Sequence, residues 1–267
     1  MQNGPNNLIF LKLGGSLLTD KTGVEALRSD VLRRLAMEIK QAAEETPELK
    51  LVLGHGSGSF GHVAAARFDT RAGVNDRQEW MGYAKVSDAA ARLNRELCGA
   101  LLDAGVPALS LQPSASAICE DGRIMQLANE PVLAALSAGL LPVVYGDVAF
   151  DTVRGGTIIS TEEIMSFLAK DLDPSWLLLA GETDGVLDSH GRPYPVVNED
   201  NLPDIASSLG GSRGTDVTGG MESKVRGMLD LVGENSGLSV RVFSGLLAGN
   251  VRDVLSGKGD GLGTVIS

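Results

Sequence analysis

Short runs of apolar residues recur along the chain and alternate with longer stretches in which apolar residues return every three or four positions. The short runs are nearly continuous in hydrophobicity, which is typical of strands buried on both faces of a parallel sheet. The strands predicted in this way are Leu8–Leu13, Leu51–Leu53, Ala108–Leu111, Leu141–Tyr145, Trp176–Ala180 and Val240–Phe243. Their alternation with helices predicts an α/β fold with a mostly parallel sheet and helices on both of its faces.

Helical spacing is clearest in two stretches. Ser29 is expected to cap a helix whose apolar face includes Leu35 and Ile39, and residues 79–104 repeat the same spacing. Shorter helices are expected at residues 131–138, with Pro131 in the first turn, and near residues 63–67. Between Asp184 and Thr218 glycines and prolines stand among polar residues, which predicts loops or a small hairpin over a site.

The chain has no internal repeat or linker that would divide its 267 residues into separate domains. We expect a single domain, with an N-terminal lobe of about residues 1–160 and a C-terminal lobe of about residues 161–267. The transition between the lobes is placed near residues 150–175. Chains of this length commonly fold as one α/β unit.

Charge and composition exclude several classes of function. The formal net charge is −11, whereas a nucleic-acid-binding protein needs clustered Lys and Arg to neutralise phosphates. The only cysteines, Cys98 and Cys119, form neither a disulfide framework nor a metal motif, which fits a reducing compartment. The first seven residues do not resemble a signal peptide, and no apolar run reaches the roughly 18 residues of a membrane span. We therefore expect a soluble cytoplasmic protein that binds neither nucleic acid nor membranes.

The first candidate site is the sequence KLGGS at the end of the first strand. Gly14 and Gly15 would let backbone N–H groups approach phosphate oxygens beyond the carboxyl end of a parallel strand. Lys12 stands in an otherwise apolar strand, which is costly unless the ammonium meets an anion or reaches water from the strand end. Both interpretations remain open. Lys21 would add a second cation, although by itself it is typical of a surface lysine.

The second candidate site, GHGSGSFGH at residues 54–62, follows another buried strand. Its glycines and serines before a helix would form an anion-binding turn. No Gly-Lys-Ser/Thr follows, so it is not a Walker A loop, and no suitable acidic residue completes a dinucleotide fingerprint. His62 would donate a hydrogen bond to a phosphate. We interpret His55 as structural because it lies at the strand end, with a ligand-binding role as the alternative.

Acidic residues follow two further strands. Asp147 comes directly after the strand that ends at Tyr145, where a carboxylate would orient lysines or bind Mg²⁺. Ser160 to Glu163 fits a capping box, so Glu162 and Glu163 are open to either a capping or a catalytic role. Asp184 lies in a turn that would hold a nucleoside.

The last candidate site is TGGMESK at residues 218–224, in which a Gly-Gly turn opens a helix. Lys224 lies in the first turn of this helix, where the helix dipole disfavours a cation unless an anion compensates it. Cationic side chains combined with preorganised N–H groups are what phosphoryl transfer requires.

In order and spacing these motifs resemble the amino-acid-kinase superfamily over nearly the whole chain, from Lys12 to Ile266. Within it, KLGGS with TDK, HGSGSFGH, GDV, TDGV and TGGMESK are most similar to the isopentenyl phosphate kinase branch, with the fosfomycin kinases as close relatives. The resemblance implies an open αβα sandwich, a homodimer, and ATP with Mg²⁺ as the phosphoryl donor. It places the acceptor, isopentenyl phosphate, in the N-terminal lobe and ATP in the C-terminal lobe.

The resemblance also implies roles for individual residues. Three lysines would neutralise the transferring phosphoryl group: Lys12, Lys21 and Lys224. The residues implied in ATP binding are Lys12, Gly14, Gly15, Ser16, Gly58, Asp184, Gly219, Gly220 and Lys224. Those implied in acceptor binding are Gly56, Ser57, Gly58, His62 and Gly156. His62 and Asp147 would join the lysines in catalysis, and no protein ligand for a metal is implied.

Two positions depart from the family pattern. Ser57 replaces a glycine of the usual HGGGSFGH, and Ser160-Thr161-Glu162 replaces Ser-Gly-Asp or Ser-Ser-Asp. A direct role for Glu162 is thereby open to question. Besides isopentenyl phosphate phosphorylation, two alternatives remain: a kinase for another small phosphate or phosphonate such as fosfomycin, and a non-catalytic nucleotide- or oxyanion-binding protein. The presence of the three lysines together speaks against the second alternative.

Overall fold

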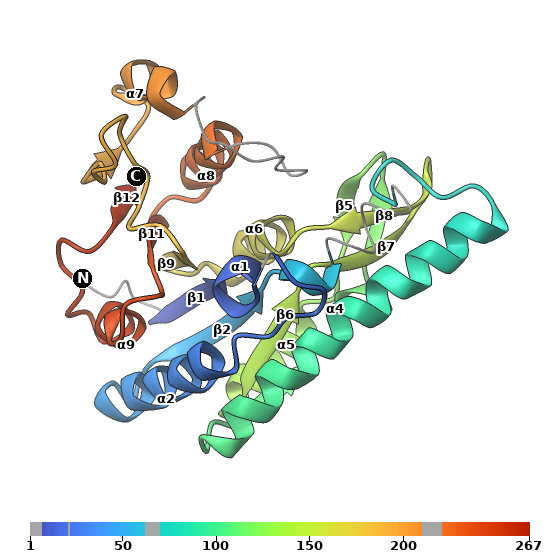
Figure 1. Cartoon of the computed structure of the whole chain (residues 1–267), viewed down its shortest axis with the longest axis horizontal. Coiled ribbons are helices and arrows are strands. Elements are labelled where there is room, and N and C mark those ends of the chain that lie inside the picture. The colour runs from blue at the N-terminus through green and yellow to red at the C-terminus, as the bar shows by residue number, and fades with distance from the viewer. Residues whose placement is uncertain (1–6, 21, 62–69, 210–220) are drawn as a thin grey trace.

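The computed structural model describes residues 7–20, 22–61, 70–209 and 221–267. Its main sheet has the strand order β10-β12-β11-β9-β1-β2-β6-β3 (Figure 1). These strands are β10 (Val196–Val197), β12 (Thr264–Ile266), β11 (Ser239–Ser244), β9 (Trp176–Gly181), β1 (Leu8–Leu13), β2 (Lys50–His55), β6 (Leu141–Tyr145) and β3 (Ala108–Ser110). Every pair in it is parallel except β11 with β12. The predicted parallel α/β sheet is confirmed.

Strand β1 lies at the centre of the sheet and sends alternate side chains into two cores. Phe10 packs with the cluster on one face, while Ile9 and Leu11 pack with the cluster on the other, and all three are almost fully buried. Side chains of successive strand residues point to opposite faces, so a strand covered on both sides must be apolar throughout. This accounts for the continuous apolar run in the sequence.

Helices cover both faces, which makes the molecule an open αβα sandwich. The Ile9 and Leu11 face is covered by α2 (Ser29–Glu45), α4 (Arg77–Asp103) and α9 (Asn250–Leu255). The Phe10 face is covered by α5 (Glu130–Ser137), α6 (Thr161–Leu172), α7 (Leu202–Leu209) and α8 (Met221–Glu234). The chain also forms α1 (Gly15–Leu18) and the 3-10 turn η1 (Pro113–Ala115).

Three details of the helices differ from the sequence prediction. Ser29 is the first residue of α2 and not its cap, a position that Arg28 takes without a side-chain bond. Helix α4 begins at Arg77, because Asp76 caps it in a capping box with Glu79. The segment expected to hold loops or a small hairpin has an antiparallel bridge between Leu187 and Pro193 but also contains α7. The helix expected near residues 63–67 lies outside the described residues.

A second, four-stranded sheet of order β5-β4-β7-β8 lies beside the N-terminal end of α4 (Figure 1). It comprises β5 (Arg123–Gln126), β4 (Ile118–Glu120), β7 (Asp147–Asp151) and β8 (Gly155–Ile159). Its turns are joined through Asp151, whose carboxylate accepts hydrogen bonds from the N–H groups of residues 121, 122, 153 and 154. Burial would raise the pKa of Asp151, but these four donors lower it.

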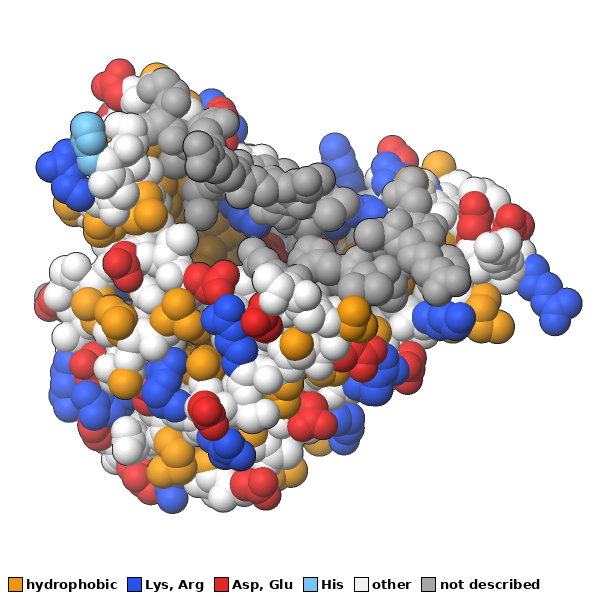
Figure 2. All heavy atoms as spheres, in the orientation of Figure 1, with side chains coloured by type: hydrophobic (Ala, Val, Ile, Leu, Met, Phe, Trp, Pro, Cys, Tyr) orange, Lys and Arg blue, Asp and Glu red, His pale blue; other side chains and the backbone are white. Residues whose placement is uncertain are grey.

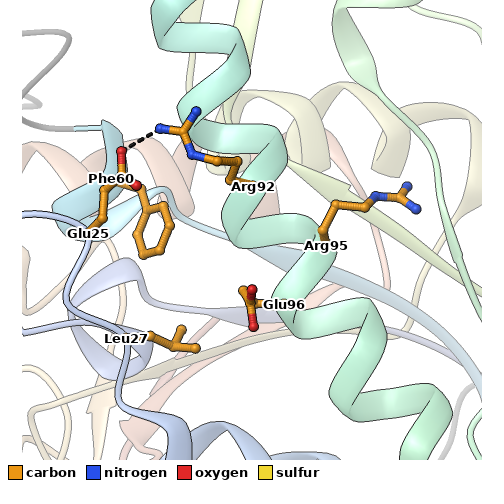
Figure 3. Close-up of a pocket in the computed structure, with 6 residues that line it drawn as sticks. All are labelled: Glu25, Leu27, Phe60, Arg92, Arg95 and Glu96. Carbon is orange, nitrogen blue, oxygen red and sulfur yellow. Dashed lines mark hydrogen bonds and ion pairs between the residues drawn. The ribbon is translucent and has the colours of Figure 1, made fainter.

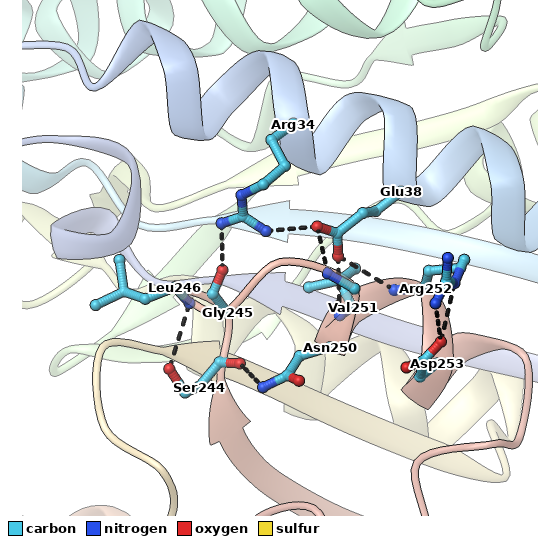
Figure 4. A network of polar contacts seen from close by, with 10 residues as sticks. Arg34, Glu38, Ser244, Gly245, Leu246, Asn250, Val251, Arg252 and Asp253 are labelled. Carbon is cyan, nitrogen blue, oxygen red and sulfur yellow. Dashed lines mark hydrogen bonds and ion pairs between the residues drawn. The ribbon is translucent and has the colours of Figure 1, made fainter.

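A buried carboxylate joins α2 to the C-terminal part of the chain (Figure 4). Glu38 accepts hydrogen bonds from the N–H groups of Gly249 and Val251, 3.0 and 3.1 Å away, and so caps the start of α9. Arg34 pairs with Glu38 at 2.5 Å and donates to the carbonyl oxygen of Gly245 at 2.6 Å. Because charge-assisted bonds of this kind are strong, the loop after β11 is fixed against α2.

Charges of both signs are interspersed over the described part of the surface seen in Figure 2. Residues of α2 illustrate this, since Arg33 pairs with Asp30 and Lys40 with Glu44. The described part of this face therefore presents no continuous basic surface of the kind that nucleic-acid binding requires. No helix among the described residues is long and apolar enough to cross a bilayer.

Candidate active site

Two glycine-rich turns meet at the carboxyl ends of β1 and β2. The strands are paired so that Leu13 lies opposite His55, and the Gly56 N–H donates to the Leu13 carbonyl at 3.0 Å. A Cβ added to Gly15 would lie 2.3 Å from the Gly58 nitrogen, closer than real Cβ contacts come. The turns approach each other this closely only because their facing residues are glycines.

These turns carry backbone donors that the fold leaves unused. Among the described residues, none accepts a hydrogen bond from the N–H groups of Gly15, Ser16, Ser57 or Gly58. By contrast, the Ser59 N–H donates to Thr19 Oγ1 at 2.9 Å, and Thr19 donates to the Gly15 carbonyl at 2.8 Å. Adjacent unpaired N–H groups form a site for a phosphate.

Lys12 forms an ion pair with Glu162 at the side of these turns. The two residues come from β1 and from the first turn of α6, and their side chains are only 15% and 25% exposed. Burial raises the pKa of the Glu162 carboxyl, but Lys12, and more weakly Lys224, outweigh it and leave the pKa below its usual value. Lys224, in the first turn of α8, thus acts electrostatically on the same carboxylate. The structure thus brings together two of the three predicted lysines.

The position of Glu162 follows from how α6 begins. Ser160 and Glu163 form the capping box: Ser160 Oγ accepts from the Glu163 N–H at 3.1 Å, and Glu163 accepts from the Ser160 N–H at 2.6 Å. Thr161 Oγ1 donates to the His55 carbonyl at 2.6 Å and accepts from the Gly146 N–H at 2.9 Å. Of the two acids, Glu163 is therefore the partner of the N-cap residue Ser160. The contacts of Thr161 fix α6 to the ends of β2 and β6, with Glu162 facing Lys12.

Asp147 lies at the start of β7 and is almost fully buried. Its carboxylate accepts hydrogen bonds from the N–H groups of Val148 at 2.9 Å and Ser114 at 3.3 Å. Burial, and then the charge of Asp147, raise the pKa values of Tyr83 and Tyr145 above the usual value. Within the described ranges its hydrogen-bond partners are backbone N–H groups, and no ion pair joins it to a lysine there.

Gly156 borders a small apolar cluster formed by α4 and the second sheet. A Cβ at Gly156 would lie 2.9 Å from the ring of Tyr83 and 3.1 Å from Val74. The cluster contains Val74, Tyr83, Val86 and Val148, with Ile158 packed against it. The Tyr83 hydroxyl is buried and has no hydrogen-bond partner among the described residues.

On the other side of β1, the turn that holds Asp184 follows β9. The Gly14 N–H donates to the Ala180 carbonyl at 2.8 Å, so the end of β9 adjoins the first glycine turn. The side chain of Asp184 is exposed. Four further predicted site residues lie outside the described residues: Lys21, His62, Gly219 and Gly220.

A sequence model of the amino acid kinase family matches residues 7–244. The chain belongs to the amino acid kinase family. It is 34% identical to the isopentenyl phosphate kinase of Methanocaldococcus jannaschii over 95% of this chain and 97% of that one. It is 33% identical to the isopentenyl phosphate kinase of Methanothermobacter thermautotrophicus over 94% and 96% of the two chains.

Solved structures give the same result for the fold. A crystal structure of an isopentenyl phosphate kinase superimposes with a TM-score of 0.82 at 28% identity, covering 97% of this chain and all of the other. Membership of the amino acid kinase family and the resemblance to its isopentenyl phosphate kinase branch, both predicted from the motifs, are confirmed.

The sequence left the roles of Glu162 and Glu163 undecided, and the structure distinguishes them. The spacing of the capping box could have distinguished them, because the box needs an acid three residues after Ser160 and therefore uses Glu163. The preceding acid, Glu162, was thus available for another contact. What the sequence did not contain was the partner, since Lys12 is 150 positions away.

An open pocket near the second glycine turn is separate from the group formed by Lys12 and Glu162 (Figure 3). It is lined by Glu25, Leu27, Phe60, Arg92, Arg95 and Glu96. Arg92 is paired with Glu25, and the side chain of Arg95 extends away from both Glu25 and Phe60. None of the site residues predicted from the sequence lines this pocket.

Proposed function

We propose that this chain transfers the γ-phosphoryl group of ATP to isopentenyl phosphate, giving isopentenyl diphosphate and ADP. The observation that carries the phosphotransferase assignment is the grouping of Lys12, Glu162 and Lys224 beside two glycine turns with unused N–H donors. The acceptor is assigned from the relatives, which are isopentenyl phosphate kinases matching nearly the full length of both chains.

The reaction forms a bond between an acceptor phosphate oxygen and the γ-phosphorus and breaks the bond to the oxygen that bridges the β- and γ-phosphorus atoms. The acceptor oxygen is already ionised near neutral pH, so the reaction needs no strong general base. Catalysis then consists of positioning and of stabilising negative charge on the transferring group. Lys12 and Lys224 would supply that charge, together with Lys21. Glu162 would hold the Lys12 ammonium in place between reaction cycles.

ATP would bind between the first glycine turn and the end of β9. Gly14, Gly15 and Ser16 would lie against its β- and γ-phosphates, and Asp184, Gly219 and Gly220 would contact the rest of the nucleotide. Within the described ranges no three His, Cys, Asp or Glu side chains are arranged to hold a metal ion. We propose that Mg²⁺ would be coordinated mainly by triphosphate oxygens and water, as is usual for this ion.

The acceptor phosphate would bind at the second glycine turn, to Gly56, Ser57, Gly58 and His62. Its hydrocarbon tail would lie toward Gly156 and the apolar cluster around Tyr83, because Val148 of this cluster comes shortly after the end of β6. Asp147 would contribute to catalysis from the acceptor side of the site. We further propose that the protein is a cytoplasmic homodimer with the two lobes expected from its sequence.

Parallel assays of ADP release with isopentenyl phosphate, with fosfomycin and without an acceptor test this proposal. We expect ADP release to depend on isopentenyl phosphate. Faster release with fosfomycin would assign the chain to the other kinase branch. Tight ATP binding without ADP release from any mixture would instead support a non-catalytic nucleotide-binding protein.

A further inference from the structure

His55, the last residue of β2, is fully buried and every polar atom of its ring is used. Its ring stacks on Tyr145 of β6, with centroids 5.3 Å apart and an angle of 14° between the planes. Nδ1 lies 3.2 Å from the carbonyl oxygen of Gly56, and Nε2 lies 3.1 Å from the side-chain amide nitrogen of Asn94. A buried imidazole in two such contacts has one orientation.

The partners of the ring also determine which nitrogen carries the proton. A carbonyl oxygen only accepts, so Nδ1 must be the donor to Gly56. The amide of Asn94 is oriented by Ser110, which donates to its oxygen at 2.5 Å, and this turns the amide NH₂ toward Nε2. Nε2 must then accept. His55 is therefore neutral, with its proton on Nδ1, and burial lowers its pKa to about 4.

The bond from Nδ1 sets the direction of the phosphate-binding turn. In a trans peptide the carbonyl and the following N–H point in opposite directions. Because the Gly56 carbonyl is held against the buried imidazole, the Ser57 N–H is turned the other way, and no described residue accepts a hydrogen bond from it. The His55 carbonyl is also fixed, by Thr161 at the start of α6.

We propose that His55 is a positioning residue for the acceptor phosphate: its Nδ1–H holds the Gly56 carbonyl and thereby directs the Ser57 N–H toward the ligand, while Asn94 selects the tautomer. The inference rests on the proposed function, since it assigns the second glycine turn to the acceptor. Asn94 lies on α4, which also supplies Tyr83 to the apolar cluster. The relay from Ser110 through Asn94 and His55 to Gly56 thus joins the helix expected near the acceptor tail to the turn expected to bind its phosphate.

The proposal predicts different effects for three substitutions. His55→Phe keeps the ring that stacks on Tyr145 but loses both hydrogen bonds. His55→Asn keeps an N–H donor near the position of Nδ1, and Asn94→Leu removes only the partner of Nε2. Losing a hydrogen bond of this kind is expected to weaken acceptor binding about tenfold. We expect the Kd of isopentenyl phosphate to rise most in His55→Phe and less in His55→Asn and Asn94→Leu, with the Kd of ATP unchanged in all three.

The test combines ¹⁵N NMR of the full-length protein with calorimetric titration of isopentenyl phosphate and of ATP. The chain has only three histidines, so the His55 ring can be assigned by comparison with the His55→Asn spectrum. We expect Nδ1 protonated and Nε2 unprotonated throughout pH 6–8. A proton on Nε2, or a folded His55→Phe variant with unchanged affinity for isopentenyl phosphate, would overturn the inference. Equal losses of affinity for acceptor and ATP would also overturn it, since they indicate a general structural role.

Failure of the proposed function is seen separately, in the wild-type protein. If wild-type protein does not bind isopentenyl phosphate but binds ATP, the acceptor assignment fails and the inference with it. If His55→Phe does not fold, His55→Asn and Asn94→Leu decide: the inference requires both to weaken acceptor binding at unchanged ATP affinity, and unchanged acceptor binding in both rejects it.

Discussion

Lys12 and Glu162 form an ion pair although 150 positions separate them in the sequence. One lies in the central strand and the other in the first turn of α6, where Lys224 also acts on the carboxylate. Glutamate stands here where the motif of the family usually has aspartate. Its longer side chain reaches the ammonium of Lys12, so the departure does not remove an acid from the site.

Replacing Glu162 is expected to impair catalysis without unfolding the protein. In Glu162→Gln the shape is kept but the charge that holds Lys12 is lost, and misplacement of a catalytic group lowers turnover by roughly ten- to a hundredfold. The matched control is Glu163→Ala, which removes the capping box and costs about 1 kcal/mol of stability. The steady-state rate should fall mainly in Glu162→Gln, whereas the melting temperature should fall mainly in Glu163→Ala. Reduced turnover in Glu163→Ala alone would contradict the assignment of the two acids.

Lys224→Ala is expected to give a folded protein with severely impaired phosphoryl transfer. Losing a donor that stabilises charge in the transition state typically lowers turnover by about 10²–10³. Lys170→Ala is the control, because this exposed lysine pairs with Glu234 on the surface. Single-turnover rates at saturating ATP separate chemistry from binding. Wild-type turnover in a verified Lys224→Ala protein would remove this lysine from the mechanism.

Gly58→Ala is expected to destabilise the protein far more than Gly139→Ala. Both glycines have positive φ, +51° and +73°, so both substitutions carry backbone strain. At Gly58, however, the new Cβ would lie 2.1 Å from Thr19 Oγ1, whereas at Gly139 nothing lies within 4 Å. Urea unfolding should give a loss of about 1 kcal/mol for Gly139→Ala, from strain alone, and a clearly larger loss for Gly58→Ala. Equal losses would mean that the two glycine turns are not in contact.

Burial of neutral His55 makes stability depend on pH. The pKa falls from 6.5 in the unfolded chain to about 4 in the folded protein, so between these values the unfolded state binds more protons. The free energy of unfolding should therefore decrease as the pH falls from 6.5 toward 4, by at most about 1.4 kcal/mol per pH unit from this residue. In His55→Asn the free energy of unfolding should depend less steeply on pH, by an amount that corresponds to at most one proton. An unchanged slope would show that His55 is protonated in the native state.

The parallel strands of the main sheet were predictable because burial on both faces requires apolar residues at every position, as in β1 and β6. The second sheet was not predicted, since its strands are short and some mix exposed with buried residues, as Ile118–Glu120 does. Helix α7 was missed because Leu202–Leu209 stands in a segment rich in glycine, proline and polar residues.

The candidate site was predictable as far as strand ends and glycine turns define it. The meeting of Gly15 with Gly58 follows from the pairing of β1 with β2. The pairing of Lys12 with Glu162 did not follow, because it depends on how α6 is attached through Thr161. The backbone contacts of Asp147 were likewise not visible in the sequence, since its partner Ser114 belongs to a turn outside the motifs.

The central claim is tested most directly by ³¹P NMR of a mixture of the protein, ATP, Mg²⁺ and isopentenyl phosphate. We predict that the resonances of ATP and of the acceptor monophosphate decrease together while those of ADP and of a new diphosphate increase in equal amounts. The Lys224→Ala variant should leave the mixture almost unchanged over the same time. ADP formation without a new diphosphate, or an unchanged mixture with wild-type protein that binds ATP, would contradict the account.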